Sequence, residues 1–151
     1  MSLNITYENF ERLDPEVLNH LLTLEEQIFP KPLKKEKIIR ELSTKHNPSI
    51  FIAFENEIPV GYKVGFERSS RIYYSWIGGV TPKFRDLGIA SELMKLQHNF
   101  AAQQGYKVVC TQTDNSFQPM IILNLKSGFE IKGTIQSTGD SHVTIVMEKS
   151  L

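Results

Sequence analysis

The chain has 151 residues, 17 Lys or Arg against 17 Asp or Glu, and a formal net charge of zero, which predicts one domain over residues 1–151 and neither a nucleic-acid nor a membrane partner. Because 40% of the residues are hydrophobic and 23% are charged, the composition excludes intrinsic disorder and collagen-like repeats. The single cysteine excludes an intrachain disulfide and a four-cysteine zinc site, and the absence of a signal-peptide pattern or long apolar run predicts a cytoplasmic protein.

Hydrophobic periodicity predicts the elements of the first half of the chain. After a short strand over residues 4–7, Asp14 and Pro15 begin a helix as its N-cap and first helical residue, and the apolar stripe of this helix ends before Pro30. The next expected elements are a helix over 34–44 and strands over 49–55, 59–67 and 71–80. The last run is rich in aromatic and β-branched residues, which predicts the central strand of a sheet.

The second half alternates strands and helices. A loop opens at Thr81 and Pro82, and the helix after it has apolar residues at helical spacing from Ile89 to Phe100 and ends at Gly105. The remaining expected elements are a strand over 106–113, a helix over 117–126 and a hairpin of strands over 129–136 and 142–149. This mixed order predicts an α/β fold with antiparallel hairpins and one parallel crossover.

Residues 80–91 join a strand to an amphipathic helix through a loop with the features of an anion-binding site. Gly88 lets the backbone approach a ligand, Ala90 and Ser91 keep bulky side chains away, and the N–H groups of the first helical turn lack helical partners. The loop therefore predicts a phosphate or pyrophosphate ligand. Neither G-x-x-x-x-G-K-[ST] nor G-x-G-x-x-G occurs, and the alternative is that Gly88 serves only the turn.

Several motifs resemble those of one known family. Residues 85–90 (RDLGIA) fit the pattern R/Q-x-x-G-x-G/A, and residues 80–82 (VTP) precede them as the family's V-x-P does. Residues 123–129 (LNLKSGF) are similar to the block L-Y-x-K-x-G-F, and residues 24–30 are similar to the family's first-helix region. On these motifs the chain is identified as a member of the GNAT superfamily of acetyl-CoA-dependent N-acetyltransferases.

The resemblance implies the GNAT acyltransferase fold, an α/β fold with a mixed central sheet of about seven strands, four helices and central parallel strands that splay apart. It also implies acetyl-CoA as cosubstrate, no metal, and an N-acetyltransferase reaction in which a primary amine of a small molecule or peptide attacks the thioester directly. A homodimer is left open.

The same resemblance places residues at the cofactor. The backbone amides of residues 86–91 would hold the pyrophosphate, Asn115 would contact the pantetheine arm, and the backbone near Val80 would face the thioester as the oxyanion donor. The residues implied for cofactor binding are Gly79, Val80, Arg85, Asp86, Leu87, Gly88, Ile89, Ala90, Ser91 and Asn115.

The catalytic acid and base depart from the family pattern. The usual acid, the tyrosine of L-Y-x-K-x-G-F, is Asn124 here, and an amide cannot supply a proton. Cys110 matches the position of a glutamate in the ribosomal-protein N-terminal alanine acetyltransferases. The candidates for the base are Glu26, Glu67 and Tyr74, each of which also fits a surface or packing role. The alternatives to an enzyme are a CoA-binding sensor without turnover and a protein-interaction domain without cofactor.

Other chemistry-bearing residues fit structural roles. Cys110 lies in an apolar strand with no histidine nearby in sequence, which favours a core residue over a nucleophile. The 4 histidines show no metal-ligand spacing. Tyr74 and Trp76 share one face of their strand, where they either pack or line an acceptor pocket.

Overall fold

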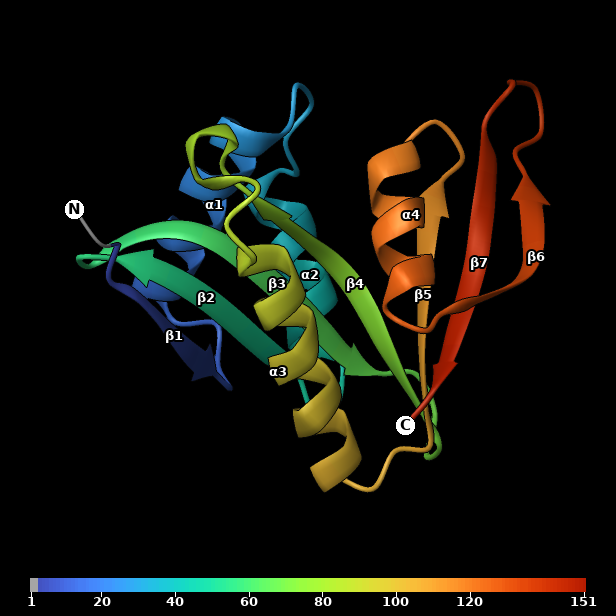
Figure 1. Ribbon diagram of the computed structural model, residues 1–151, viewed down its shortest axis with the longest axis horizontal. Coiled ribbons are helices and arrows are strands. Elements are labelled where there is room, and N and C mark those ends of the chain that lie inside the picture. The colour runs from blue at the N-terminus through green and yellow to red at the C-terminus, as the bar shows by residue number, and fades with distance from the viewer. Residues whose placement is uncertain (1–2) are drawn as a thin grey trace.

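A seven-stranded sheet forms the centre of the computed structural model, which describes residues 3–151 (Figure 1). The strands lie in the order β1-β2-β3-β4-β5-β7-β6, and every neighbouring pair is antiparallel except β4 and β5. The elements are β1 (Ile5–Phe10), α1 (Pro15–Ile28), α2 (Lys35–Thr44), β2 (Ser49–Glu55), β3 (Ile58–Glu67), β4 (Ile72–Val80), η1 (Pro82–Phe84), α3 (Ile89–Gln103), β5 (Val108–Asp114), α4 (Gln118–Lys126), β6 (Glu130–Gln136) and β7 (Val143–Ser150). This arrangement confirms the predicted mixed α/β fold.

The structure differs from the sequence prediction mainly at β1 and at the turn after β4. The sequence predicts β1 over residues 4–7, but the strand runs to Phe10 because it pairs with β2 along its whole length, ending with Phe10 opposite Ile50. As an edge strand, β1 accommodates the polar Glu8 and Asn9, which weaken its sequence signal. The segment after Thr81 is predicted as a loop and forms the short 3-10 helix η1.

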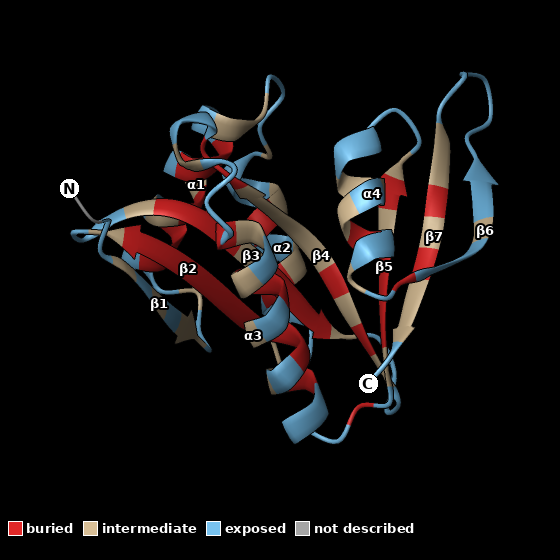
Figure 2. Ribbon diagram, in the orientation of Figure 1, coloured by how far each residue is buried: buried red, intermediate tan, exposed pale blue. Residues whose placement is uncertain are grey.

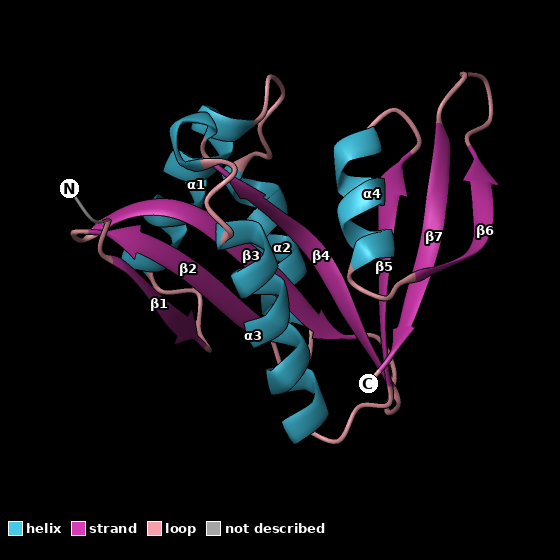
Figure 3. Cartoon of the chain, viewed as in Figure 1, coloured by secondary structure: helices cyan, strands magenta, loops and turns pink. Residues whose placement is uncertain are grey.

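Helices cover both faces of the sheet (Figure 3). α1 and α2 bury residues such as Leu21 and Ile38 against β2 and β3, whereas α3 packs Met94 on the opposite face, against Val109 of β5 and Met147 of β7. β2 is covered on both sides and is buried over most of its length, while β6 is largely exposed (Figure 2). Burial on both faces explains the continuous apolar run of β2.

The central feature of the sheet is the parting of β4 and β5 (Figure 1). Residues 72–75 of β4 pair with residues 108–111 of β5, and beyond them the two strands diverge. β4 continues along β3, while β5 continues along β7. A register shift between β3 and β4 leaves Trp76 without a partner, and such a bulge increases the local twist of a strand. The predicted splay of the central parallel strands is confirmed.

A buried carboxylate ties α1 to the sheet. Glu25 is only 2% exposed, and it falls within the apolar stripe of α1. One carboxylate oxygen accepts a hydrogen bond from the Tyr62 hydroxyl of β3, and the other accepts one from the Leu33 N–H at 2.7 Å. Burial, and then the neighbouring carboxylate, raises the pKa of Tyr62, so this hydroxyl stays protonated and donates. Glu25 therefore fixes both the helix and the connection from α1 to α2.

We expect Glu25→Leu to lower the free energy of unfolding by roughly 2 to 5 kcal/mol, because it leaves the Tyr62 hydroxyl and the Leu33 N–H buried without an acceptor. The matched control is Glu26→Leu, one residue along the helix and exposed, which should change stability by less than about 0.5 kcal/mol. Urea denaturation followed by circular dichroism measures both variants. Equal midpoints for the two variants would show that the carboxylate of Glu25 is not a structural group.

Candidate active site

The loop between β4 and α3 has an unusual backbone. Asp86 and Gly88 both adopt left-handed conformations, with φ of 62° and 82°, and nothing lies within 4 Å of the position that a Cβ at Gly88 would take. The Arg85 side chain fastens the loop to the strand, since its Nε donates to the Val80 carbonyl oxygen at 3.1 Å. Of these residues, only Gly88 occupies the left-handed region without a steric penalty.

This loop presents a row of free backbone donors. Within residues 3–151, no hydrogen-bond acceptor faces the N–H groups of residues 86–91, and the first helical bond of α3 runs from the Glu92 N–H to the Gly88 carbonyl at 3.0 Å. No side chain caps α3, whereas Asp14 caps α1 by accepting from the Val17 N–H at 2.9 Å. Free N–H groups at a helix N-terminus favour an anion. The geometry fits the phosphate site predicted from the sequence.

A cleft of about 250 Å³ lies where β4 and β5 part. Its lining residues come from both strands and from the ends of neighbouring elements: Phe29, Lys63, Ser75, Trp76, Ile77, Gly78, Thr111, Gln112, Thr113, Asp114, Phe117 and Met120. A smaller hollow of about 20 Å³ shares Lys63, Gly78 and Met120 with the cleft and reaches Ala90 in the first turn of α3. The small hollow therefore lies between the cleft and the first turn of α3.

Backbone and hydroxyl groups in this cleft lack partners. The Thr81 N–H donates to Val60 of β3 at 2.9 Å, so strand alternation points the N–H groups of Val80 and Gly78 away from β3, toward the space that β5 has left. The Ser75 hydroxyl is buried and has no hydrogen-bond partner among residues 3–151. A buried polar group without a partner costs about 1 to 3 kcal/mol. These groups indicate a cleft suited to a polar ligand.

Two glycines let other elements approach β4. A Cβ at Gly79 would lie 3.0 Å from the Ile28 side chain of α1, and a Cβ at Gly78 would lie 2.9 Å from Cδ of Lys63. The Lys63 side chain therefore crosses β4 over Gly78 and enters the cleft. Burial lowers the pKa of Lys63 to about 8.

The sequence-predicted cofactor residues fall at this site. Residues 85–91 form the loop and the first turn of α3, while Gly79 and Val80 line the small hollow beside it. Asn115 follows β5 with its side chain exposed and its N–H bonded to the Val143 carbonyl at 2.8 Å. It lies between Asp114 and Phe117, both of which line the cleft.

The sequence-predicted catalytic residues are not gathered in the cleft. Asn124 is buried, and its amide donates to the Thr113 hydroxyl at 3.5 Å, so it lies close behind the β5 wall. Tyr74 packs beside Phe66 with the Arg68 guanidinium 5.1 Å from its ring, and burial raises its pKa.

The two glutamates lie farther from the cleft. Glu26 is exposed and borders a separate hollow with residues 31–36. Glu67, at the end of β3, accepts from the Tyr106 hydroxyl at 2.9 Å. Neither of them lines the cleft.

An Asp–His pair at the cleft was not predicted from the sequence. His142 Nδ1 lies 3.0 Å from Oδ2 of Asp114, which lines the cleft at the end of β5. Hydrogen bonds from Ser116, and then from His142, hold the pKa of Asp114 below its usual value. The two residues are 28 positions apart and meet because β5 and β7 pair with Asp114 opposite Thr144. No spacing in the sequence signals this contact.

The remaining polar residues have structural surroundings. Cys110 is buried, and burial raises the pKa of its thiol, so it is a core residue rather than a thiolate nucleophile. Burial first, and then Lys149, lowers the pKa of His98 to about 3, so this ring is neutral. No group of three or more His, Cys, Asp or Glu side chains in residues 3–151 is arranged to hold a metal ion. Among the same residues, every helix is too short or too polar to cross a membrane.

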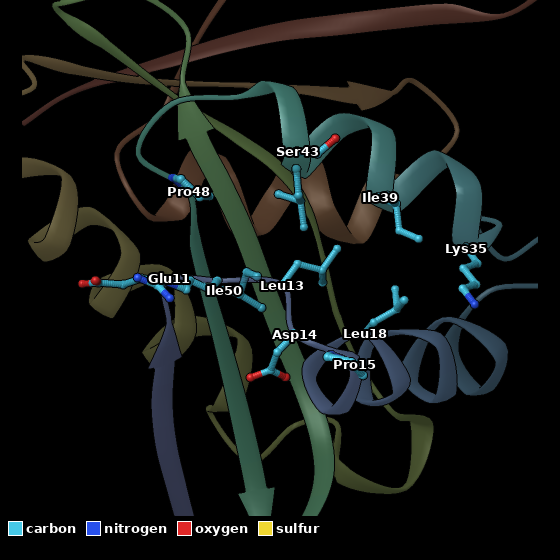
Figure 4. Close-up of a pocket in the computed structure, with 12 residues that line it drawn as sticks. Glu11, Leu13, Asp14, Pro15, Leu18, Lys35, Ile39, Ser43, Pro48 and Ile50 are labelled. Carbon is cyan, nitrogen blue, oxygen red and sulfur yellow. The ribbon is translucent and has the colours of Figure 1, made fainter.

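A larger hollow, of about 560 Å³, lies between the start of α1 and α2 (Figure 4). Leu18, Ile39 and Ile50 form apolar parts of its wall, and the Asp14 carboxylate at its rim already caps α1. It contains none of the free amides of the loop and none of the described buried polar groups that lack partners. The cleft between β4 and β5 is therefore the candidate active site.

Comparisons with known proteins show the family of the chain. Residues 15–129 match the model of the acetyltransferase (GNAT) family. A search of curated proteins gave no match.

Solved structures share the fold. The ribosomal-protein-S18-alanine N-acetyltransferase from Escherichia coli superposes with a TM-score of 0.83 at 13% identity, over 97% of this chain and 94% of that chain. Arabidopsis thaliana Naa50 in complex with the bisubstrate analogue CoA-Ac-MVNAL superposes with a TM-score of 0.78 at 21% identity, over 97% of this chain and 99% of that chain. A GNAT family acetyltransferase from Elizabethkingia anophelis with acetyl-CoA bound superposes with a TM-score of 0.73 at 22% identity, over 98% of this chain and 99% of that chain.

Proposed function

The chain belongs to the acetyltransferase (GNAT) family, and from this premise we propose that it is a single-domain N-acetyltransferase that moves an acetyl group from acetyl-CoA to a primary amine. The observation that carries the proposal is the row of free N–H groups at residues 86–91, together with the cleft between β4 and β5 and the small hollow that leads from it to Ala90. A CoA molecule needs both features, because it joins a pyrophosphate to an extended amide-containing arm.

The residues present fit this cosubstrate. The amides of residues 86–91 face the pyrophosphate, and Gly88 keeps a side chain out of its path. The arm would lie along residues 78–80, where strand alternation leaves the N–H groups of Gly78 and Val80 free to bond its carbonyl oxygens. Acetyl-CoA, when bound, supplies the activated acetyl thioester. The open N–H groups of β4 then donate to the thioester oxygen as negative charge develops on it.

A proton must leave the attacking amine, and we infer that it goes to the Asp114–His142 pair, whose aspartate lines the cleft. With Nδ1 of His142 donating to Asp114, Nε2 is the free acceptor nitrogen. The free energy needed to deprotonate the attacking amine depends on the pKa of that amine. At pH 7, deprotonating a lysine-like amine of pKa about 10.4 requires about 4.6 kcal/mol, but an α-amine of pKa about 7.9 requires about 1.2 kcal/mol.

The lack of a catalytic acid at Asn124 costs less free energy than the lack of a base would cost for a lysine-like amine. A thiol of pKa about 8.5 that leaves as the thiolate at pH 7 forfeits about 2 kcal/mol. Asn124 lies behind the β5 wall and has no proton to give, so water takes this role. The alternative function, a CoA-binding sensor without turnover, rests on this same substitution.

The acceptor proposed is the α-amine of a peptide or of a small molecule. It has the lower deprotonation cost, and two of the structural neighbours are an S18-alanine N-acetyltransferase and a complex with a CoA-peptide analogue. A cytoplasmic location is proposed with it, from the lone Cys110 of the sequence.

We expect acetyl-CoA to bind and stabilise the protein, by about 2.7 kcal/mol at 100 times its dissociation constant. Thermal unfolding with and without acetyl-CoA measures this shift. Release of CoA thiol, followed with a panel of peptides, amino acids, polyamines and aminoglycosides, then tests transfer. Binding without acceptor-dependent thiol release would favour the sensor, and the absence of any thermal shift would remove acetyl-CoA from the proposal.

Gly88→Val should abolish CoA binding in a folded protein, because a β-branched residue is strained at a φ of 82° and narrows the approach to the amides. The matched control is Gly105→Val at the other end of α3, where φ is 94° and the Cβ position is equally open. Arg85→Ala should weaken binding by only about 0 to 1 kcal/mol. Calorimetric titration gives the affinities and circular dichroism checks folding. Wild-type affinity in a folded Gly88→Val protein would place the phosphate elsewhere.

His142→Gln should lower kcat/KM about a hundredfold, because it removes the group that we propose accepts the amine proton. His46→Gln, at an exposed histidine on another surface, is the control and should match the wild type. The steady-state rate of thiol release measures both variants. A wild-type kcat/KM in His142→Gln would exclude this base without affecting the assignment of acetyl-CoA.

A further inference from the structure

Lys63 lies at the junction between the phosphate-binding loop and the cleft. It lines the cleft with Ser75 and Thr111, and it also lines the small hollow that leads to Ala90 of α3. Its stem crosses β4 over Gly78, where a Cβ would come within 2.9 Å of Cδ of Lys63. A thioester arm that starts at the amides of residues 86–91 and enters the cleft must pass this side chain.

The amine of Lys63 has no partner in the described part of the chain. No hydrogen bond or ion pair within residues 3–151 includes its Nζ. The charged and titratable groups toward this side are His98 from α3 and Lys149 from β7, neither of which offers a carboxylate. Asp114 lines the same cleft but bonds to His142.

The surroundings raise the neutral fraction of Lys63. Burial lowers the pKa of Lys63 to about 8, so about a tenth of the side chain is neutral at pH 7, far more than for an exposed lysine. A lysine amine that is partly desolvated and has no partner is activated as a nucleophile.

We propose that Lys63 is an internal acyl acceptor, which the protein acetylates from acetyl-CoA within its own cleft. The inference rests on the proposed function for the identity of the acyl donor. The neutral Nζ forms a bond to the thioester carbonyl carbon, the carbon–sulfur bond breaks, and the proton lost by Nζ leaves with the CoA sulfur as a thiol. No other reactant is required.

Acetylation of Lys63 would change the cleft. The product is an uncharged amide on the same stem, and it lies beside Met94, Met120 and Leu123, which favour an uncharged group. Because Lys63 lines both the cleft and the hollow that leads to Ala90, the longer acetylated side chain narrows the path of the CoA arm and slows the binding of further acyl donor. Lys63 thus makes the enzyme self-limiting when acetyl-CoA is present without an amine acceptor.

To test this inference, the whole protein is incubated with acetyl-CoA and no added amine, and the acetylated lysines are identified by peptide mass spectrometry. We expect Lys63 to be acetylated at least about a hundredfold faster than the exposed Lys95 of α3, because the reactants are held together. Excess CoA should suppress the reaction at Lys63 and leave Lys95 unaffected. Lys63→Arg should lose the fast modification, whereas the matched control Lys95→Arg should keep it.

The pH dependence adds a second readout. Acetylation of Lys63 should rise with pH and level off above about pH 8, whereas that of Lys95 should continue to rise. A protein that binds CoA by calorimetry and releases thiol with an external amine, but leaves Lys63 unmodified, would overturn this inference alone. A protein that does not bind CoA would overturn both this inference and the proposed function.

Discussion

The separation of β4 from β5 is the constraint on which the rest of the site depends. Inside a sheet, each strand satisfies the backbone groups of its neighbour, and buried backbone groups without partners are rare. Beyond residues 72–75, β4 has β3 on one side only, so the N–H groups on its other edge have no partner in the sheet. The cleft exists because β4 and β5 do not pair beyond these residues. The backbone N–H groups of β4 that face the cleft are therefore free to bond a ligand.

The sheet tolerates this gap because each half has its own core. On one side, β1 to β4 are held by α1 and α2, where the buried Glu25 joins helix and strand through Tyr62. On the other side, β5, β7 and β6 form a second ladder. α3 packs against β2, β3 and β4, and its Met94 also reaches Val109 and Met147. The helix that presents the free amides is thus anchored to both halves, and the loop does not depend on the gap being filled.

Three buried polar side chains lower the stability of the fold, and one of them, Ser75, lines the cleft. Ser75, Gln97 and His98 each have a buried polar atom without a partner among residues 3–151, and such atoms cost about 1 to 3 kcal/mol each. Gln97 and His98 are adjacent on α3, and Ser75 lies on β4 at the point where the strands part. Groups of this kind persist near functional sites, where a better-packed apolar residue would stabilise the fold but change the cleft.

Most of the fold and the position of the loop before α3 were predictable from the sequence, because they depend on local patterns. Asp14 and Pro15 begin α1, the spacing of Ile89, Leu93 and Phe100 defines α3, and Gly88 marks the loop. These signals act over a few residues, within one turn or one strand.

The polar contacts that hold the fold and border the cleft join residues far apart in the chain, and only the tertiary structure showed them. Glu25 meets Tyr62 at a separation of 37 residues, and Asp114 meets His142 at a separation of 28. Lys63 enters the cleft because the register of β3 and β4 sets it opposite Gly78. The sequence determined which segments become strands and helices and where the loop with Gly88 falls, since local spacing encodes them. Strand register decided which side chains meet in the cleft, because periodicity within one segment carries no information about the residue opposite it.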